Sequence, residues 1–179
     1  MIALTQGIQL FSGAFFDYKN PHQSEVCIDD IAHALSLVCR FAGHISEFYS
    51  VAQHAVNTSH LVTERHAYTA LLHDTAEAFT NDIPTPLKTA IPAFKDLEVE
   101  IEEAMARRFD FTFPLPPEVK MADLQMLKLE REELKPHATG CWEVLQGVNT
   151  VGLRERVDLN GWSPAYAKHR FLQRYWELV

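Results

Sequence analysis

Apolar residues recur at intervals of three and four positions in several stretches of the chain, which is the spacing of one helix face. The first such stretch covers residues 31–41; it follows two acidic residues that favour a helix start and precedes Gly43, which is expected to end it. Ser50 and Gln53 have the spacing of a capping box, in which each side chain binds a backbone N–H group at the helix start. A second helix is therefore predicted to begin at Ser50.

The segment Glu64–Phe79 is rich in Ala, Leu and Glu and contains no Gly or Pro, so it predicts one uninterrupted, centrally placed helix. Pro84 and Pro86 follow it and predict a shaped loop, because proline removes a backbone donor and disfavours helix in the residue before it. Periodic apolar residues and helix-start prolines predict three later helices, at about 97–105, 116–134 and 163–175. Residues 8–21 are typical of an irregular or hairpin-like lead-in, whereas residues 135–162 show no periodicity.

These patterns predict an all-α protein in which residues 1–179 form one compact helical domain. A chain of about this length buries roughly two thirds of its unfolded surface around a single core. Within the domain, a lead-in over 1–27 precedes a central part over about 28–134. An irregular segment and a final helix make up 135–179.

Composition and charge narrow the classes of partner. The 24 acidic residues outnumber the 16 Lys and Arg residues, and the net charge of −8 argues against a nucleic-acid duplex as a partner. The three cysteines form no CxxC pair, which argues against a zinc ribbon or a disulfide framework and favours a reducing, cytoplasmic setting. The first residues lack the features of a secretory signal, and no apolar run approaches the roughly 20 residues of a membrane helix, so no membrane partner is expected.

His73 and Asp74 interrupt the otherwise apolar run LLHDTAEA. An unpaired carboxylate is costly to bury, so another group must compensate the charge of Asp74. A divalent cation would do so directly, and the combination of imidazole nitrogen and carboxylate oxygen suits Mn, Fe, Co, Ni or Zn. A salt bridge between Asp74 and an arginine is the alternative.

Further ligands for such a cation must come from other helices, because adjacent helix residues point about 100° apart. His54 on the preceding predicted helix and Asp123 on a later one are the candidates, and two imidazoles with two carboxylates would neutralise a divalent cation. Glu77 lies one turn beyond His73, close enough to take a proton from a water molecule at the metal. The alternative for Glu77 is a solvated helix glutamate.

The chain contains these residues in a characteristic order: His54, then LLHDTAEA, then DIPTPLK with Asp82, then VKMAD, which ends at Asp123. This order resembles the HD superfamily of metal-dependent phosphohydrolases. The likeness is closest to the compact 5′-deoxynucleotidases of bacteria and to the short HD nucleotide phosphohydrolases also found in phages. It covers about residues 28–134.

The resemblance implies one divalent transition metal ion (Co, Mn, Ni, Fe or Zn) with four ligands: His54, His73, Asp74 and Asp123. It implies Glu77 as the residue that activates or positions the water, and Asp82 as a residue near the nucleoside sugar. Dinuclear relatives carry additional histidines between the HD pair and the last aspartate, and residues 75–122 contain none. One metal ion is therefore expected.

The segment CRFAGHISEFYSVAQH resembles the family stretch in which an arginine and an aromatic residue precede the first metal-binding histidine. Arg40 is accordingly expected to contact phosphate, with Lys88 beside it, and Phe41 to be a packing or base-side residue. The family aromatic is often Trp, and Phe41 lacks the indole N–H donor, which affects base selection. His33, in IAHALS, competes with His54 for the ligand role, but only His54 follows the Arg-aromatic stretch as the family's first histidine does.

The expected function is metal-dependent hydrolysis of phosphate from nucleotides, with 2′-deoxynucleoside monophosphates preferred. A deoxynucleoside triphosphate triphosphohydrolase is one alternative. A catalytically inactive HD protein that senses nucleotides is another, although such a protein would be expected to have lost a ligand or Glu77. A nucleotide is the expected partner, and self-association into a homo-oligomer stays open.

Overall fold

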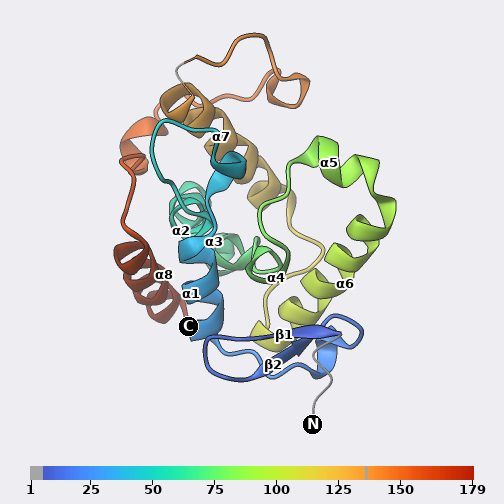
Figure 1. Ribbon diagram of the computed structural model, residues 1–179. Helices are drawn as coiled ribbons and strands as arrows, with labels where there is room; N and C mark the ends of the chain where they lie inside the picture. Colours follow the sequence, from blue (N-terminus) through green and yellow to red (C-terminus); the bar gives the residue numbers. More distant parts are fainter. Residues whose placement is uncertain (1–5, 136) are drawn as a thin grey trace.

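The computed structural model describes residues 6–135 and 137–179, and the regular secondary structure of this part of the chain is helical apart from one short hairpin (Figure 1). The helices are α1 (Ile28–Leu37), α2 (Val51–Leu61), α3 (Glu64–Leu72), α4 (Glu77–Thr80), α5 (Thr85–Ala90), α6 (Pro92–Phe109), α7 (Pro117–Leu134) and α8 (Pro164–Leu178). Four 3₁₀ turns connect them: η1 (Pro21–Gln23), η2 (Arg40–Gly43), η3 (Glu143–Leu145) and η4 (Arg154–Arg156). The predicted all-α class is confirmed. None of the described helices has both the length and the apolar character needed to cross a membrane.

The antiparallel hairpin of β1 (Gly7–Gln9) and β2 (Phe15–Asp17) lies at one end of the molecule (Figure 1). It confirms the hairpin-like lead-in expected from the sequence. Phe16 is fully buried and stacks on Phe79 of α4, with ring centroids 3.9 Å apart. The hydroxyl of Tyr18 donates a hydrogen bond to the carbonyl oxygen of Phe79 at 2.5 Å. The hairpin is thereby attached to α4.

Helix α2 lies at the centre of the fold, where it packs against α1, α3, α7 and α8. Every residue of α2 except His60 is buried. The Ser50 hydroxyl accepts a hydrogen bond from the Gln53 N–H group, which confirms the predicted start of the helix. The predicted contact of the Gln53 side chain with a backbone N–H group at the helix start is wrong. This side chain forms hydrogen bonds instead with the backbone of residues 158–162.

Helix α1 ends at Leu37, whereas the sequence pattern predicts a helix as far as Phe41. The chain becomes extended at Val38 and Cys39 because its backbone pairs with the strand-like segment before α2. The Val51 N–H group donates to the Val38 oxygen, and the Arg40 N–H group donates to the Tyr49 oxygen. This pairing places Arg40 in the interior, where only 7% of its surface is exposed.

The predicted helix over Glu64–Phe79 is interrupted by a turn at residues 73–76, between α3 and α4. Its N–H groups bond three residues back: Thr75 to Leu72, Glu77 to Asp74 and Ala78 to Thr75. Such bonds wind the backbone more tightly than an α-helix does. The prediction of one continuous helix is therefore wrong at the HD pair, whose side chains project from the tight turn.

Helices α7 and α8 begin where the sequence pattern predicts, whereas α6 begins at Pro92 and ends at Phe109, beyond both ends of the predicted helix over 97–105. Helix α7 begins at Pro117 and ends at Leu134 as predicted, and the Ser163 hydroxyl caps α8 by accepting from the Tyr166 N–H group. The region of Pro84 and Pro86 is more ordered than the predicted loop, because Pro86 occupies the first turn of the short helix α5, where a missing donor costs nothing. Within 135–162, the described residues form only the turns η3 and η4.

Candidate metal centre and active site

Four nitrogen and oxygen donors converge where α2, the turn after α3, and α7 meet. The Nε2 atom of His54 lies 3.1 Å from Asp123 Oδ1 and 3.3 Å from His73 Nε2. The Oδ2 atom of Asp74 lies 3.2 Å from His73 Nε2 and 3.6 Å from His54 Nε2. Ligand atoms bound about 2.0–2.2 Å from one cation stand roughly 3.0–3.5 Å from each other. The ligand atoms of His54, His73 and Asp123 all lie within 4.8 Å of one another, so these three residues could hold a single metal ion, and Asp74 lies beside them as a fourth candidate ligand.

Both imidazoles direct the same ring nitrogen toward this centre. The Nδ1 atom of His73 lies 2.7 Å from the Ala70 carbonyl oxygen, so Nδ1 donates to that oxygen and Nε2 is the nitrogen available to a metal ion. The Nδ1 atom of His54 lies 2.6 Å from the Oε1 atom of Glu130. Hydrogen bonds at the outer nitrogen are a common feature of metal-binding histidines.

The charges at the centre also fit a cation. Burial opposes protonation of His73, but the carboxylates of Asp74 and Asp123 outweigh burial and raise the pKa of this imidazole well above its usual value. Burial likewise opposes ionisation of Asp123, but hydrogen bonds from His54 and His73 hold the pKa of its carboxyl well below the usual range. A group of donors that attracts a proton so strongly in the absence of metal is suited to a divalent ion.

Glu77 begins α4, the helix that follows the HD turn. Only 8% of its surface is exposed, and its Oε2 atom is buried without a hydrogen-bond partner among the described residues. Burial, together with the negative charges of Asp74 and Asp82, raises the pKa of the Glu77 carboxyl well above its usual value. The alternative of a solvated helix glutamate is excluded by this burial, and a carboxyl in such an environment is a candidate proton acceptor.

Arg40 faces the same centre from η2. Its Nε atom lies 3.0 Å from Glu130 Oε2, and its Nη1 atom lies 3.8 Å from Asp74 Oδ2. An arginine therefore stands near Asp74, as the salt-bridge alternative required, but it does so together with the two histidines. A guanidinium can bind phosphate oxygens in two places at once, so Arg40 is a candidate phosphate contact.

Asp82 follows α4 and lies beside η2. Its Oδ2 atom accepts a hydrogen bond of 3.2 Å from the Phe41 N–H group. Phe41 and Ala42 both have left-handed backbone conformations, with φ of 56° and 51°, which is costly for residues other than glycine. The hydrogen bond to Asp82 is one of the contacts that hold this turn in place.

The predicted phosphate-binding residue Lys88 lies on α5, where its ammonium group contacts two carboxylates. Its Nζ atom lies 2.5 Å from Glu98 Oε1 on α6 and 4.0 Å from Glu77 Oε1. Lys88 is thus close to the predicted proton acceptor as well as to the pocket.

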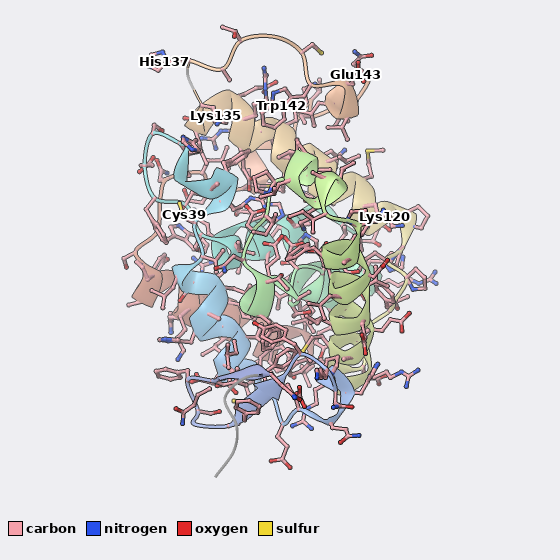
Figure 2. All side chains as sticks on the ribbon, turned by 45° about the vertical axis from the view of Figure 1, so that its right-hand side comes forward. Cys39, Lys120, Lys135, His137, Trp142 and Glu143 are labelled. Carbon is pink, nitrogen blue, oxygen red and sulfur yellow. The ribbon has the colours of Figure 1, made fainter. Side chains whose placement is uncertain are left out.

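A pocket of about 1120 Å³ opens above the metal-ligand candidates. Its walls contain Arg40, Asp74, Glu77, Asp82, Lys88 and Asp123 together with Phe41, Lys135 and Trp142. Figure 2 shows Lys135 and Trp142 at the end of the molecule where α7 ends, below the arch of chain that passes through His137. The rings of Phe41 and Trp142 lie 6.3 Å apart, and Lys135 Nζ lies 5.3 Å from the centre of the Phe41 ring. Aromatic and cationic groups therefore line the outer part of the pocket.

His33 does not join the four donors. Its ring stacks on Phe11 of the lead-in, with centroids 3.8 Å apart, and it therefore packs between α1 and the hairpin loop. This position favours His54 over His33 as the first metal-binding histidine.

Sequence reasoning missed three residues of the site: Glu130, Lys135 and Trp142. Glu130 follows Asp123 by seven positions, which is two helical turns, so both side chains project from the same side of α7. That spacing could have indicated Glu130 as a residue of the site. Trp142 lies in the aperiodic segment 135–162, where no sequence pattern indicated a site residue.

Comparison with known proteins agrees with this geometry. The model of the family described as 5′-deoxynucleotidase YfbR-like matches residues 23–139. The chain is 40% identical over 171 residues to the uncharacterized protein YfdR of Escherichia coli K12, which covers 96% of this chain and 94% of that relative. It is 32% identical over 140 residues to an uncharacterized protein of Rhodobacter capsulatus, covering 70% of this chain and 71% of the relative. It is also 36% identical over 74 residues to the 5′-deoxynucleotidase PM0747 of Pasteurella multocida, covering 41% of this chain and 31% of that enzyme.

The matched residues 23–139 contain all four metal-ligand candidates, Glu77 and Arg40. The likeness to the HD superfamily and its compact 5′-deoxynucleotidases, inferred from the order of motifs, is confirmed. The chain belongs to the 5′-deoxynucleotidase YfbR-like family of HD-domain nucleotide phosphohydrolases.

Proposed function

We propose that this protein is a metal-dependent phosphohydrolase that removes phosphate from 2′-deoxynucleoside monophosphates. The observation that carries the proposal is the convergence of His54, His73, Asp74 and Asp123 beside a buried arginine and a buried glutamate in one pocket. Family membership and the relative named a 5′-deoxynucleotidase support it.

The four donors would hold one divalent transition metal ion, of the group Co, Mn, Ni, Fe and Zn. When bound, such an ion lowers the pKa of a water molecule and offsets the charge of a phosphate. The guanidinium of Arg40 binds the phosphate oxygens and orients the phosphorus for in-line attack. Glu77 accepts the proton of the attacking water at Oε2, the oxygen that has no hydrogen-bond partner among residues 6–135 and 137–179.

Asp82 and the outer pocket would hold the nucleoside. The second oxygen of the Asp82 carboxylate would accept a hydrogen bond from the 3′-hydroxyl of the sugar, since Oδ2 already accepts one from the Phe41 N–H group. A sugar anchored in this way leaves little room for a 2′-hydroxyl. Phe41 and Trp142 provide aromatic surface on the base side.

Two other functions make different predictions. A deoxynucleoside triphosphate triphosphohydrolase would use the same centre but needs more cationic groups around the phosphates, and Lys88 and Lys135 are the lysines that line the pocket. A nucleotide sensor with an inactive HD centre is disfavoured, because every predicted ligand and Glu77 are present. The protein is further proposed to act in the cytoplasm and to fold as one domain.

Steady-state hydrolysis of dAMP, AMP, dATP and ATP with Mn²⁺ and Co²⁺, followed by product analysis, tests these functions. The proposal expects dAMP to have the highest kcat/KM and inorganic phosphate to be released. Equal kcat/KM values for dAMP and AMP would contradict the sugar preference, and inorganic triphosphate from dATP as the best reaction would favour the triphosphohydrolase. Nucleotide binding by calorimetry without turnover of any of the four would favour the sensor.

A further inference from the structure

We propose that Glu130 is a positioning residue that fixes His54 and Arg40 in one geometry, so that the metal site and the phosphate contact share one carboxylate. The inference rests on the proposed function for the roles of His54 and Arg40. It adds a residue that is not among the site residues predicted from the sequence.

The contacts of Glu130 divide between its two oxygen atoms. Oε1 lies 2.6 Å from His54 Nδ1, and Oε2 lies 3.0 Å from Arg40 Nε. None of the surface of Glu130 or of His54 is exposed, and Arg40 is 7% exposed. A carboxylate with no access to water keeps its charge only if charged or polar donors surround it, and here each oxygen has one such donor.

The contact with His54 determines which ring nitrogen is available. A carboxylate oxygen only accepts, so His54 must donate from Nδ1, and the lone pair remains on Nε2. Nε2 is the atom that faces Asp123 and His73. Glu130 therefore selects the ring form of His54 that binds metal and prevents rotation of the ring.

The contact with Arg40 restricts a long side chain in the same way. With Nε held by Glu130, the plane of the guanidinium is fixed and its outer nitrogens are directed toward the pocket, with Nη1 3.8 Å from Asp74. Because one rigid carboxylate binds both groups, the distance between the metal and the phosphate-binding cation is set by Glu130. Asp123, two turns earlier on α7, ties this helix to the same centre.

Glu130→Gln tests the inference at constant size. A glutamine has one accepting oxygen, so its NH₂ group must face either the donor of Arg40 or the donor of His54. The first arrangement displaces Arg40, and the second forces His54 to move its proton to Nε2 and lose its metal-binding form. Glu132→Gln is the matched control, because Glu132 lies on the same helix and is exposed.

We expect the metal dissociation constant of Glu130→Gln to rise about 10- to 100-fold, measured with Zn²⁺ or Co²⁺ in the absence of nucleotide. At saturating metal, KM for dAMP should rise about tenfold or more as Arg40 loses its position. Glu132→Gln should change neither quantity by more than about twofold. A lower melting temperature of Glu130→Gln with unchanged metal affinity and KM would mean a purely structural role and overturn the proposal.

The protein without substitution provides a second test if Glu130→Gln does not fold. In the Zn²⁺-loaded protein, the ¹H–¹⁵N spectrum of the imidazoles should show His54 protonated at Nδ1 and metal-bound at Nε2. Protonation at Nε2 would overturn the inference. Both the spectrum and the metal titration are made without nucleotide, so failure of the proposed substrate class would leave their outcome intact and be recognised separately.

Discussion

The ammonium group of Lys88 lies between two carboxylates, 2.5 Å from Glu98 and 4.0 Å from Glu77. Its closest partner is thus Glu98, on the outer side of the site. Lys88 nevertheless lowers the pKa of Glu77, against the larger effects of burial, Asp74 and Asp82, which raise it. Lys88, held by Glu98, is therefore one of the groups that affect how readily Glu77 loses its proton.

Substitution of Lys88 and of Glu98 should move the pH profile in opposite directions. Glu77 must be deprotonated to accept a proton, so activity is lost as pH falls through its pKa. Lys88→Met removes a cation and raises this pKa, which shifts the acidic limb of kcat/KM toward higher pH. Glu98→Gln frees Lys88 to interact with Glu77 and shifts the same limb toward lower pH. Profiles of kcat/KM for dAMP from pH 5 to 9 measure both shifts, and a common direction would show that Lys88 acts through another group.

His54→Ala should abolish stoichiometric metal binding, whereas His33→Ala should retain it. His54 supplies one of four donors and is fully buried among them, while His33 stacks on Phe11. Elemental analysis of the purified proteins gives the metal content, with one ion per chain expected for the unsubstituted protein. A chelator should also lower the melting temperature of His33→Ala but not of His54→Ala. Bound metal stabilises the folded state, and only His33→Ala is expected to contain metal that the chelator can remove. Loss of metal from His33→Ala instead would reverse the ligand assignment.

Glu77→Gln should retain metal and fold but lose about 10²- to 10⁴-fold in kcat. The amide keeps the size of the side chain but cannot accept a proton from water. Glu103→Gln, an exposed glutamate on α6, is the control and should behave as the unsubstituted protein. Loss of metal in Glu77→Gln would identify Glu77 as a ligand, and nearly normal turnover would remove it from the mechanism.

Gln53→Leu should lower the free energy of unfolding by about 2–4 kcal/mol, from about 1 kcal/mol for each of three lost hydrogen bonds. The Gln53 amide donates to the oxygens of Asp158 and Asn160, at 2.9 and 2.7 Å, and accepts from Trp162 N–H at 2.9 Å. Urea denaturation monitored by circular dichroism gives the value. Gln173→Leu, at an exposed position of α8, should change stability by less than about 0.5 kcal/mol. If Gln53→Leu changed stability as little as Gln173→Leu does, water molecules would have to replace the three lost hydrogen bonds.

Local signals in the sequence predicted the helices that begin at a cap or a proline, because the groups that satisfy a helix start lie within three or four residues. Ser50 and Ser163 act as caps for this reason, and Pro117 begins α7. The order of His54, His73–Asp74 and Asp123 along the chain could also be recognised from the sequence, because motif order is visible without knowledge of how the helices pack.

The features that the sequence did not predict depend on partners far along the chain. The end of α1 at Leu37 depends on pairing with the segment before α2, and Gln53 bonds residues more than 100 positions away. Arg40 is buried because Glu130, 90 residues later, accepts from it. The turn at residues 73–76 follows a segment of strong helix formers, and the composition of this segment predicts a continuous helix rather than a turn. The division into one domain remains a prediction.

Helix α4 consists of a single turn, and a helix of this length has no stability of its own in water. Its position therefore depends on its neighbours, α1 and the hairpin. The hairpin contacts it through the stacked rings of Phe16 and Phe79 and through the hydrogen bond from Tyr18, 61 residues earlier in the chain. The contacts of the lead-in with α4 consequently help to position Glu77, the proposed proton acceptor. Changes in the hairpin should therefore alter the rate of reaction, although no residue of β1 or β2 lines the pocket.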